Sequence, residues 1–66
     1  MKEKYSKEII KLAKIAYKKG EVPVGAIITK NDKILARAYN KIETSKDATM
    51  HAEILAIKKA SKKLKN

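Results

Sequence analysis

The sequence contains no cysteine, tryptophan or phenylalanine, and its 66 residues include only two glycines and one proline. The lack of cysteine excludes disulfide bonds and fits a reducing environment. No apolar run approaches the roughly 20 residues that a membrane-spanning helix needs. The N-terminal stretch MKEKYSKEII also lacks the apolar core of a signal peptide. We therefore expect a soluble, cytoplasmic protein with no membrane partner.

Length and charge set further bounds on the chain. A chain of 66 residues makes one small domain at most. It buries only about 60% of its unfolded surface, so its stability is marginal without a metal or a partner. The 17 Lys and Arg residues outnumber the 7 Asp and Glu residues, giving a net charge of +10. This charge favours a polyanion such as RNA, but solvated lysines that only keep the chain soluble explain it equally well.

The first third of the sequence predicts an amphipathic helix over about residues 6–19. Ser6 can cap its start, apolar residues recur at three- and four-residue spacing, and the lysines face water. Gly20 is a natural end for this helix, and Pro23 prevents it from resuming.

The middle of the sequence predicts a β-hairpin with strands at about 24–29 and 33–39. The run VGAIIT has the branched residues and the length of a buried strand, and Asn31 and Asp32 supply the turn. Gly25 lies inside the first strand pattern, which indicates that another group approaches the backbone there.

The last third predicts a loop followed by a second helix. Residues 40–48 are polar and aperiodic, and we expect a surface loop of the kind that is often functional. Thr49 can cap a helix over about 50–64, whose closing lysines suit the helix dipole. The predicted order is helix, strand, strand, helix.

Glu53 is notable because the helical pattern places a carboxylate on an apolar seam. With an advance of about 100° per residue, Glu53 falls in line with Ile57, Ala60 and Leu64. A carboxylate buried there should be paired, protonated or used by a site, because burying it alone is costly. Alternatively, Glu53 interacts with the helix dipole from the first turn and stays solvated. The pattern leaves both readings open.

His51 is the single histidine of the chain. A lone histidine near a helix start is more often a cap or a surface residue than a metal ligand, because a metal needs several convergent ligands. On a regular helix, two side chains that are two positions apart in the sequence point roughly 160° away from each other. His51 and Glu53 can therefore converge only if His51 occupies the irregular first position of the helix.

Three spaced segments together resemble the amino-terminal half of bacterial tRNA adenosine deaminases, within the cytidine deaminase superfamily. The segments are EVPVGA at 21–26, Tyr39-Asn40, and DATMHAE at 47–53. The HAE triplet alone is a weak match, but its combination with EVPVGA and an intervening strand-turn-strand pattern is specific. EVPVGA favours the tRNA-editing branch over free-nucleoside or guanine deaminases.

The resemblance implies an α/β fold, the cytidine deaminase-like three-layer α/β/α arrangement, of which only the first helix-strand-strand-helix portion is present. It implies zinc held by His51 and by two cysteines of a downstream P-C-x-x-C motif, which these 66 residues lack. In this enzyme class water attacks C6 of adenine while a glutamate that is not a ligand moves the protons. By its position in the motif, Glu53 would be the glutamate that moves the protons.

By the same resemblance, Asn40, the backbone N–H of Ala52 and the side chain of Val22 would contact the flipped nucleoside. The implied reaction is zinc-dependent hydrolytic deamination of adenosine to inosine in tRNA, by a protein that forms a homodimer. We expect this chain to be a truncated deaminase, inactive alone. Two alternatives stay open: a small basic module that binds RNA or protein without catalysis, and an assembly in which another chain brings the cysteines.

Overall fold

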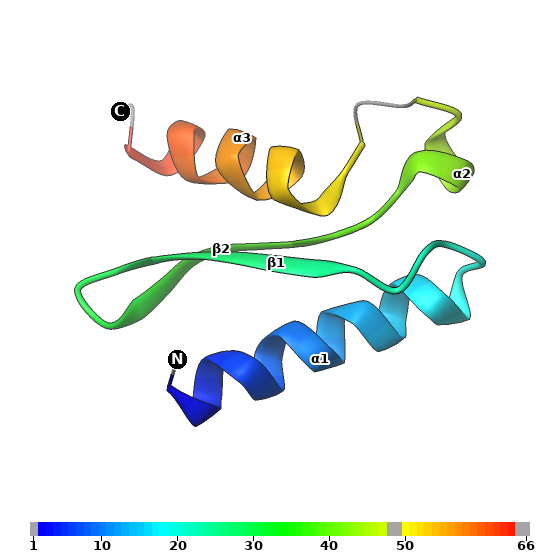
Figure 1. Cartoon of the computed structure of the whole chain (residues 1–66). Coiled ribbons are helices and arrows are strands. Elements are labelled where there is room, and N and C mark those ends of the chain that lie inside the picture. Colours follow the sequence, from blue (N-terminus) through cyan, green and yellow to red (C-terminus); the bar gives the residue numbers. More distant parts are fainter. Residues whose placement is uncertain (1, 48–49, 65–66) are drawn as a thin grey trace.

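The computed structural model describes residues 2–47 and 50–64, and it has the predicted order of main elements (Figure 1). One short helix is added within the predicted loop. The elements are α1 (Glu3–Lys18), β1 (Gly25–Lys30), β2 (Lys33–Tyr39), α2 (Ile42–Ser45) and α3 (Ala52–Leu64).

The hairpin of β1 and β2 forms the middle layer of the molecule. Figure 1 shows α1 on one side of the hairpin and α3 on the other, and each helix contacts both strands. The result is an α/β/α arrangement around a two-stranded antiparallel sheet. The α1–β1 connection, the end of β2, α2 and the start of α3 gather at the same end of the hairpin (Figure 1).

The hairpin turn confirms the prediction for Asn31 and Asp32. Lys30 lies opposite Lys33, so the turn has two residues. Both have positive φ, 53° for Asn31 and 63° for Asp32, as a type I′ turn requires. Asn and Asp tolerate this conformation better than other residues with a side chain. The local sequence therefore fixes where the strands reverse.

The start of α1 contradicts the predicted Ser6 cap. The helix begins at Glu3, Lys2 occupies the N-cap position, and no side chain caps it. The backbone N–H groups of Tyr5 and Ser6 donate to the Lys2 carbonyl at 3.0 and 3.2 Å, so Ser6 is already helical. An ion pair between Lys2 and Asp32 ties the residue before the helix to the hairpin turn. The helix thus starts before its best capping residue, next to a contact with the hairpin turn.

The end of α1 confirms the role predicted for Gly20. Its φ is 79°, a left-handed value that glycine adopts without a steric cost. The Gly20 N–H donates to the Tyr17 carbonyl at 3.1 Å, and the Glu21 N–H donates to the Ala16 carbonyl at 2.9 Å. These two bonds form a Schellman motif, which turns the chain sharply and fixes the backbone of Glu21.

Gly25 brings β1 into close contact with the backbone of α1, as its position in the strand pattern predicts. A Cβ atom on Gly25 would lie 2.6 Å from Leu12 Cβ, 2.7 Å from the Ile9 carbonyl oxygen and 3.1 Å from Ala13 N. Such distances are far inside normal contact, so only glycine lets the helix and the strand approach this closely.

The core of the described residues consists mostly of alanine. Its buried apolar members are Leu12, Ala16, Ala36, Ala38, Ala52, Ala56 and Ala60. In α3 the alanines recur every four residues, which puts them on one face of the helix. This face packs on the strands; of the predicted seam only Ala60 belongs to it, whereas Ile57 and Leu64 are exposed. Glu53 is exposed as well, so the reading in which it stays solvated holds and the reading in which it is buried is wrong.

α3 begins at Ala52, two residues later than predicted. The residue proposed to cap it, Thr49, lies outside the described residues. No helix within 2–47 and 50–64 is long and apolar enough to cross a membrane.

Candidate functional site

The predicted site residues come from three segments at one end of the hairpin. Val22 belongs to the α1–β1 connection, Asn40 directly follows β2, and His51 directly precedes α3. These segments meet at the end of the hairpin that faces α2 (Figure 1). The fold therefore gathers residues that are far apart in the sequence.

His51 and Glu53 lie close together at the start of α3. The distance from His51 Nδ1 to Glu53 Oε1 is 4.0 Å, and the two side chains are 50% and 67% exposed. His51 precedes the first helical residue, and its carbonyl accepts the Leu55 N–H at 2.9 Å. It therefore has the irregular position that convergence with Glu53 requires. Both groups can reach a ligand from the solvent side.

Asn40 is almost fully buried, with 3% of its surface exposed. Its backbone N–H donates to the Val24 carbonyl at 3.1 Å, which extends the hairpin pairing by one residue. The next N–H, that of Lys41, donates to the Met50 carbonyl at 2.9 Å. Asn40 is thus fixed between the segment after α1 and the segment that leads into His51.

Val22 and Ala52 differ sharply in burial. Val22 is 61% exposed, whereas Ala52 is fully buried against the strands. The Val22 carbonyl accepts the Val24 N–H at 2.8 Å, so the backbone turns tightly around Pro23 and leaves the Val22 side chain at the surface. An exposed valine at this end of the hairpin is available to contact a ligand.

Glu21 is a residue of this region whose importance the sequence does not reveal. Only 4% of its surface is exposed. Its carboxylate accepts the backbone N–H of Glu43 at 2.9 Å and, through the other oxygen, the N–H of Thr44. Its partners lie 22 and 23 positions away, and no local pattern indicates such a contact. Only the fold reveals it.

The hydrogen bonds around Glu21 stabilise its charged form. Burial raises the pKa of Glu21, but hydrogen bonds from the Thr44 side chain and from the N–H groups of Glu43 and Thr44 lower it. The balance leaves the pKa of this carboxyl below its ordinary value. A carboxylate that accepts several hydrogen bonds holds its negative charge more firmly than one in water.

The donor groups of this site fit one part of a metal centre. The His51 imidazole is accessible and neutral imidazole is a good ligand for zinc, while Glu53 lies beside it. Within residues 2–47 and 50–64 no three His, Cys, Asp or Glu side chains form a group able to hold a metal. His51 therefore fits as a single ligand, and further ligands must come from outside the described residues.

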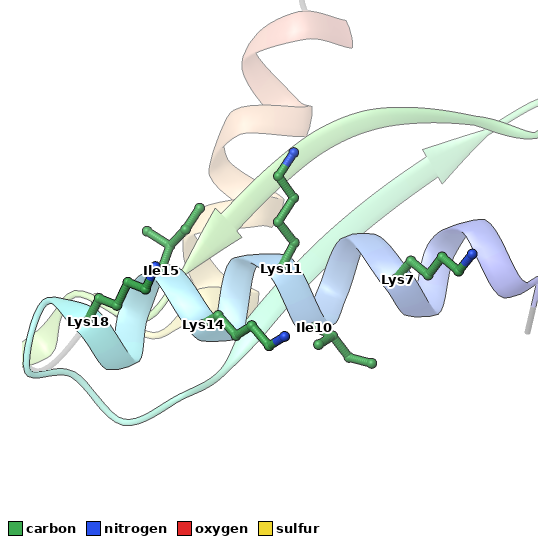
Figure 2. Close-up of a pocket in the computed structure, with 6 residues that line it drawn as sticks. All are labelled: Lys7, Ile10, Lys11, Lys14, Ile15 and Lys18. Atoms are coloured by element: carbon green, nitrogen blue, oxygen red, sulfur yellow. The ribbon is translucent and has the colours of Figure 1, made fainter.

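A hollow on the outer face of α1 is separate from these residues. It is lined by Lys7, Ile10, Lys11, Lys14, Ile15 and Lys18. Figure 2 shows the labelled lysines along α1, with Lys11 and Lys14 extending in different directions. Their ammonium groups do not converge on one point, so the hollow lacks the geometry of a focused anion site.

The chain belongs to the family described as the cytidine and deoxycytidylate deaminase zinc-binding region, whose model matches residues 1–66. The helix, hairpin and helix form the amino-terminal portion of the cytidine deaminase fold. His51 and Glu53 therefore lie in a chain whose family is described by its zinc-binding region.

Among curated proteins, the chain is similar to tRNA-specific adenosine deaminases. That of Aquifex aeolicus is 52% identical over 63 residues, covering 96% of this chain and 42% of that protein. That of Bacillus subtilis is 52% identical over 62 residues, covering 94% and 38%. The chain therefore spans less than half the length of these relatives.

Solved structures show the same fold. One, from a study of A-to-I editing by tRNA:A34 deaminases at the wobble position of transfer RNA, matches with a TM-score of 0.91 at 30% identity, over 96% of this chain and 46% of that chain. A guanine deaminase of Bacillus subtilis matches with a TM-score of 0.85 at 39% identity, over 97% and 42%.

Proposed function

We propose that the chain is the amino-terminal part of a tRNA-specific adenosine deaminase, which converts adenosine to inosine in tRNA with release of ammonia. The observation that carries the proposal is the His51–Glu53 pair, 4.0 Å apart at the start of α3, in a chain 52% identical to tRNA-specific adenosine deaminases. A net charge of +10 supports an RNA substrate.

In this proposal each site residue has a distinct role. His51 holds zinc through its imidazole, together with cysteines from the remainder of the protein. Bound zinc supplies Lewis-acid activation of the attacking water. Glu53 takes one proton from the attacking water and gives it to the ring nitrogen, then takes the proton of the added hydroxyl and gives it to the amine, which leaves as ammonia. Its exposed carboxylate beside His51 supports this role, because it can reach both water and substrate.

The remaining residues hold the base. The buried Asn40 presents its side-chain amide from a backbone fixed at both neighbours. An amide offers both donors and an acceptor to a nucleoside. The backbone N–H of Ala52 faces the base edge, and the exposed Val22 side chain supplies apolar contact at the same end of the hairpin. These assignments rest on the family pattern and on the position of each residue.

The proposal extends to a homodimeric, cytoplasmic parent protein. Ile57 and Leu64 of α3 are more than half exposed, and in this proposal the rest of the protein or a second subunit covers them. The isolated 66-residue chain is expected to form no inosine, because it has no cysteine to complete the zinc site.

A chimera tests the proposed activity. The chain replaces the 63 residues that it matches in the Aquifex aeolicus enzyme, so the rest of the domain is supplied by that relative. We expect the purified chimera to bind zinc and to form inosine in an RNA stem-loop whose loop carries an adenosine. A folded, zinc-loaded chimera that leaves this RNA unchanged would contradict the proposal.

A second candidate is deamination of the free base guanine. The guanine deaminase structure is 39% identical to the chain, above the 30% of the tRNA:A34 deaminase structure. The same chimera separates the two candidates when ammonia release is measured with guanine and with the RNA stem-loop. Turnover of guanine without turnover of RNA would favour this second function.

A further inference from the structure

The α1–β1 connection and α2 are joined by the carboxylate of Glu21. The Schellman motif at the end of α1 fixes the Glu21 backbone through its N–H bond to Ala16, 2.9 Å long. From this fixed point the buried side chain reaches Glu43 and Thr44, the second and third residues of α2. Glu21 therefore fixes α2 relative to the end of α1.

Glu21 also takes the place of a missing helix cap. The N-cap residue of α2 is Lys41, which makes no side-chain capping bond. A cap side chain normally accepts the N–H of the second or third helical residue, and here Glu21 accepts both. Helices as short as Ile42–Ser45 are not stable alone, so α2 depends on this carboxylate.

α2 is joined to the proposed site through residues that are next to the site residues in the chain. Asn40 and Lys41 lead into α2, and their N–H groups bond to the carbonyls of Val24 and Met50. Met50 directly precedes His51. Release of α2 would therefore loosen Lys41 and its bond to Met50. Lys41 directly follows the residue with the proposed base-binding amide, and Met50 directly precedes the proposed zinc ligand.

We propose that Glu21 is a positioning residue that acts through α2 to hold the Asn40 amide in its place for the substrate base. The proposal rests on the function proposed above. A carboxylate is required because it presents acceptors only, whereas the amide of glutamine turns an NH₂ group toward N–H donors. Glu21→Gln thus keeps the shape of the side chain and removes one acceptor.

Hydrogen exchange on the 66-residue chain tests the structural step without any need for activity. In Glu21→Gln we expect the amide protons of Glu43 and Thr44 to exchange about tenfold faster or more, because opening of α2 becomes easier. The backbone N–H proton of Asn40 should also exchange faster, while the backbone N–H protons in the middle of α1 keep their rates. Glu3→Gln, which alters an exposed carboxylate on α1, is the matched control. Unchanged exchange at Glu43 and Thr44 would overturn the proposal.

A double-mutant cycle in the chimera tests the functional step. We expect Glu21→Gln to lower kcat/KM by about tenfold or more, since small misplacements of substrate-binding groups are costly. After Asn40→Ala the same change should add little, because coupled residues give non-additive effects. Additive losses, or an unimpaired Glu21→Gln chimera, would overturn the proposal. A wild-type chimera with no deaminase activity would instead refute the proposed function, while the exchange rates would still decide whether Glu21 holds α2.

Discussion

The side chain of Lys59 donates from its Nζ to the carbonyl oxygen of Arg37 at 2.8 Å, which joins α3 to the outer edge of β2. Along a strand of an antiparallel pair, the backbone N–H and C=O groups of successive residues point alternately toward the partner strand and away from it. Because the Asn40 N–H bonds to Val24, the Arg37 carbonyl faces away from β1. Lys63 makes the same kind of bond to the Leu35 carbonyl. Two lysines of α3 therefore occupy the acceptors along this edge.

Removal of these lysines should expose the edge. We expect Lys59→Ala combined with Lys63→Ala to promote self-association, because an open strand edge can pair with another chain. Lys58→Ala combined with Lys62→Ala is the matched control, since these lysines are exposed on the same helix and the charge lost is the same. Sedimentation velocity at increasing concentration measures the effect. Equal association in both double variants would show that charge alone keeps the chains apart.

Gly25 should tolerate no side chain. We expect Gly25→Ala to lower the free energy of unfolding by about 1–3 kcal/mol, the usual cost of overpacking, because its Cβ would press on the Ile9 carbonyl and Leu12. Urea titration followed by circular dichroism measures the loss. Gly20→Asn provides the comparison, because Gly20 has open space around it and Asn accepts a positive φ. A loss as large for Gly20→Asn would mean that the close contact is not the cause.

The parts of the fold that were predicted correctly depend on local conformational rules. Asn31-Asp32 demands a tight turn, Gly20 ends a helix through its positive φ, and Gly25 allows two backbones to meet. These effects involve a few neighbouring residues, so the sequence pattern reveals them. For His51 and Glu53 the sequence indicated only the condition for their convergence, and the structure meets it because α3 begins after His51.

The features that were missed depend on contacts between distant segments. α1 starts at Glu3 without a side-chain cap, beside an ion pair from Lys2 to the hairpin turn that the capping preference of Ser6 does not include. α2 receives its capping bonds from Glu21, 22 positions away from Glu43. Glu53 is exposed because the small alanines turn their own face of α3 toward the strands, and the helical pattern alone did not decide between this outcome and a buried carboxylate.

Glu21 should make the stability of the chain depend on pH. Its pKa in the folded chain lies below the ordinary value that the unfolded chain has. The unfolded state therefore binds the proton more readily, and the stabilisation is complete above the ordinary pKa and is lost as pH falls through the lowered folded value. We expect the wild-type chain to melt at a higher temperature than Glu21→Gln near neutral pH, and this difference to shrink as the pH falls below the ordinary pKa of a glutamate.

The matched control for this pH dependence is Glu3→Gln, whose carboxylate is exposed. Its melting temperature should follow that of the wild-type chain at every pH. A constant difference between wild type and Glu21→Gln across the acid range would mean that the charge of Glu21 does not stabilise α2.

Substitutions of His51 and of Glu53 should affect metal binding and proton transfer separately. In the chimera with the Aquifex aeolicus enzyme, we expect Glu53→Ala to keep stoichiometric zinc and to lose inosine formation, because a general acid–base group contributes about 10²–10⁴-fold to the rate. His51→Ala should lose zinc itself, since a catalytic site with three protein ligands cannot spare one. Metal analysis of the dialysed proteins and a single-turnover inosine assay measure the two properties independently. Zinc retained in His51→Ala but lost in Glu53→Ala would mean that their roles are exchanged, and the exposed carboxylate rather than the imidazole would then be the ligand at the start of α3.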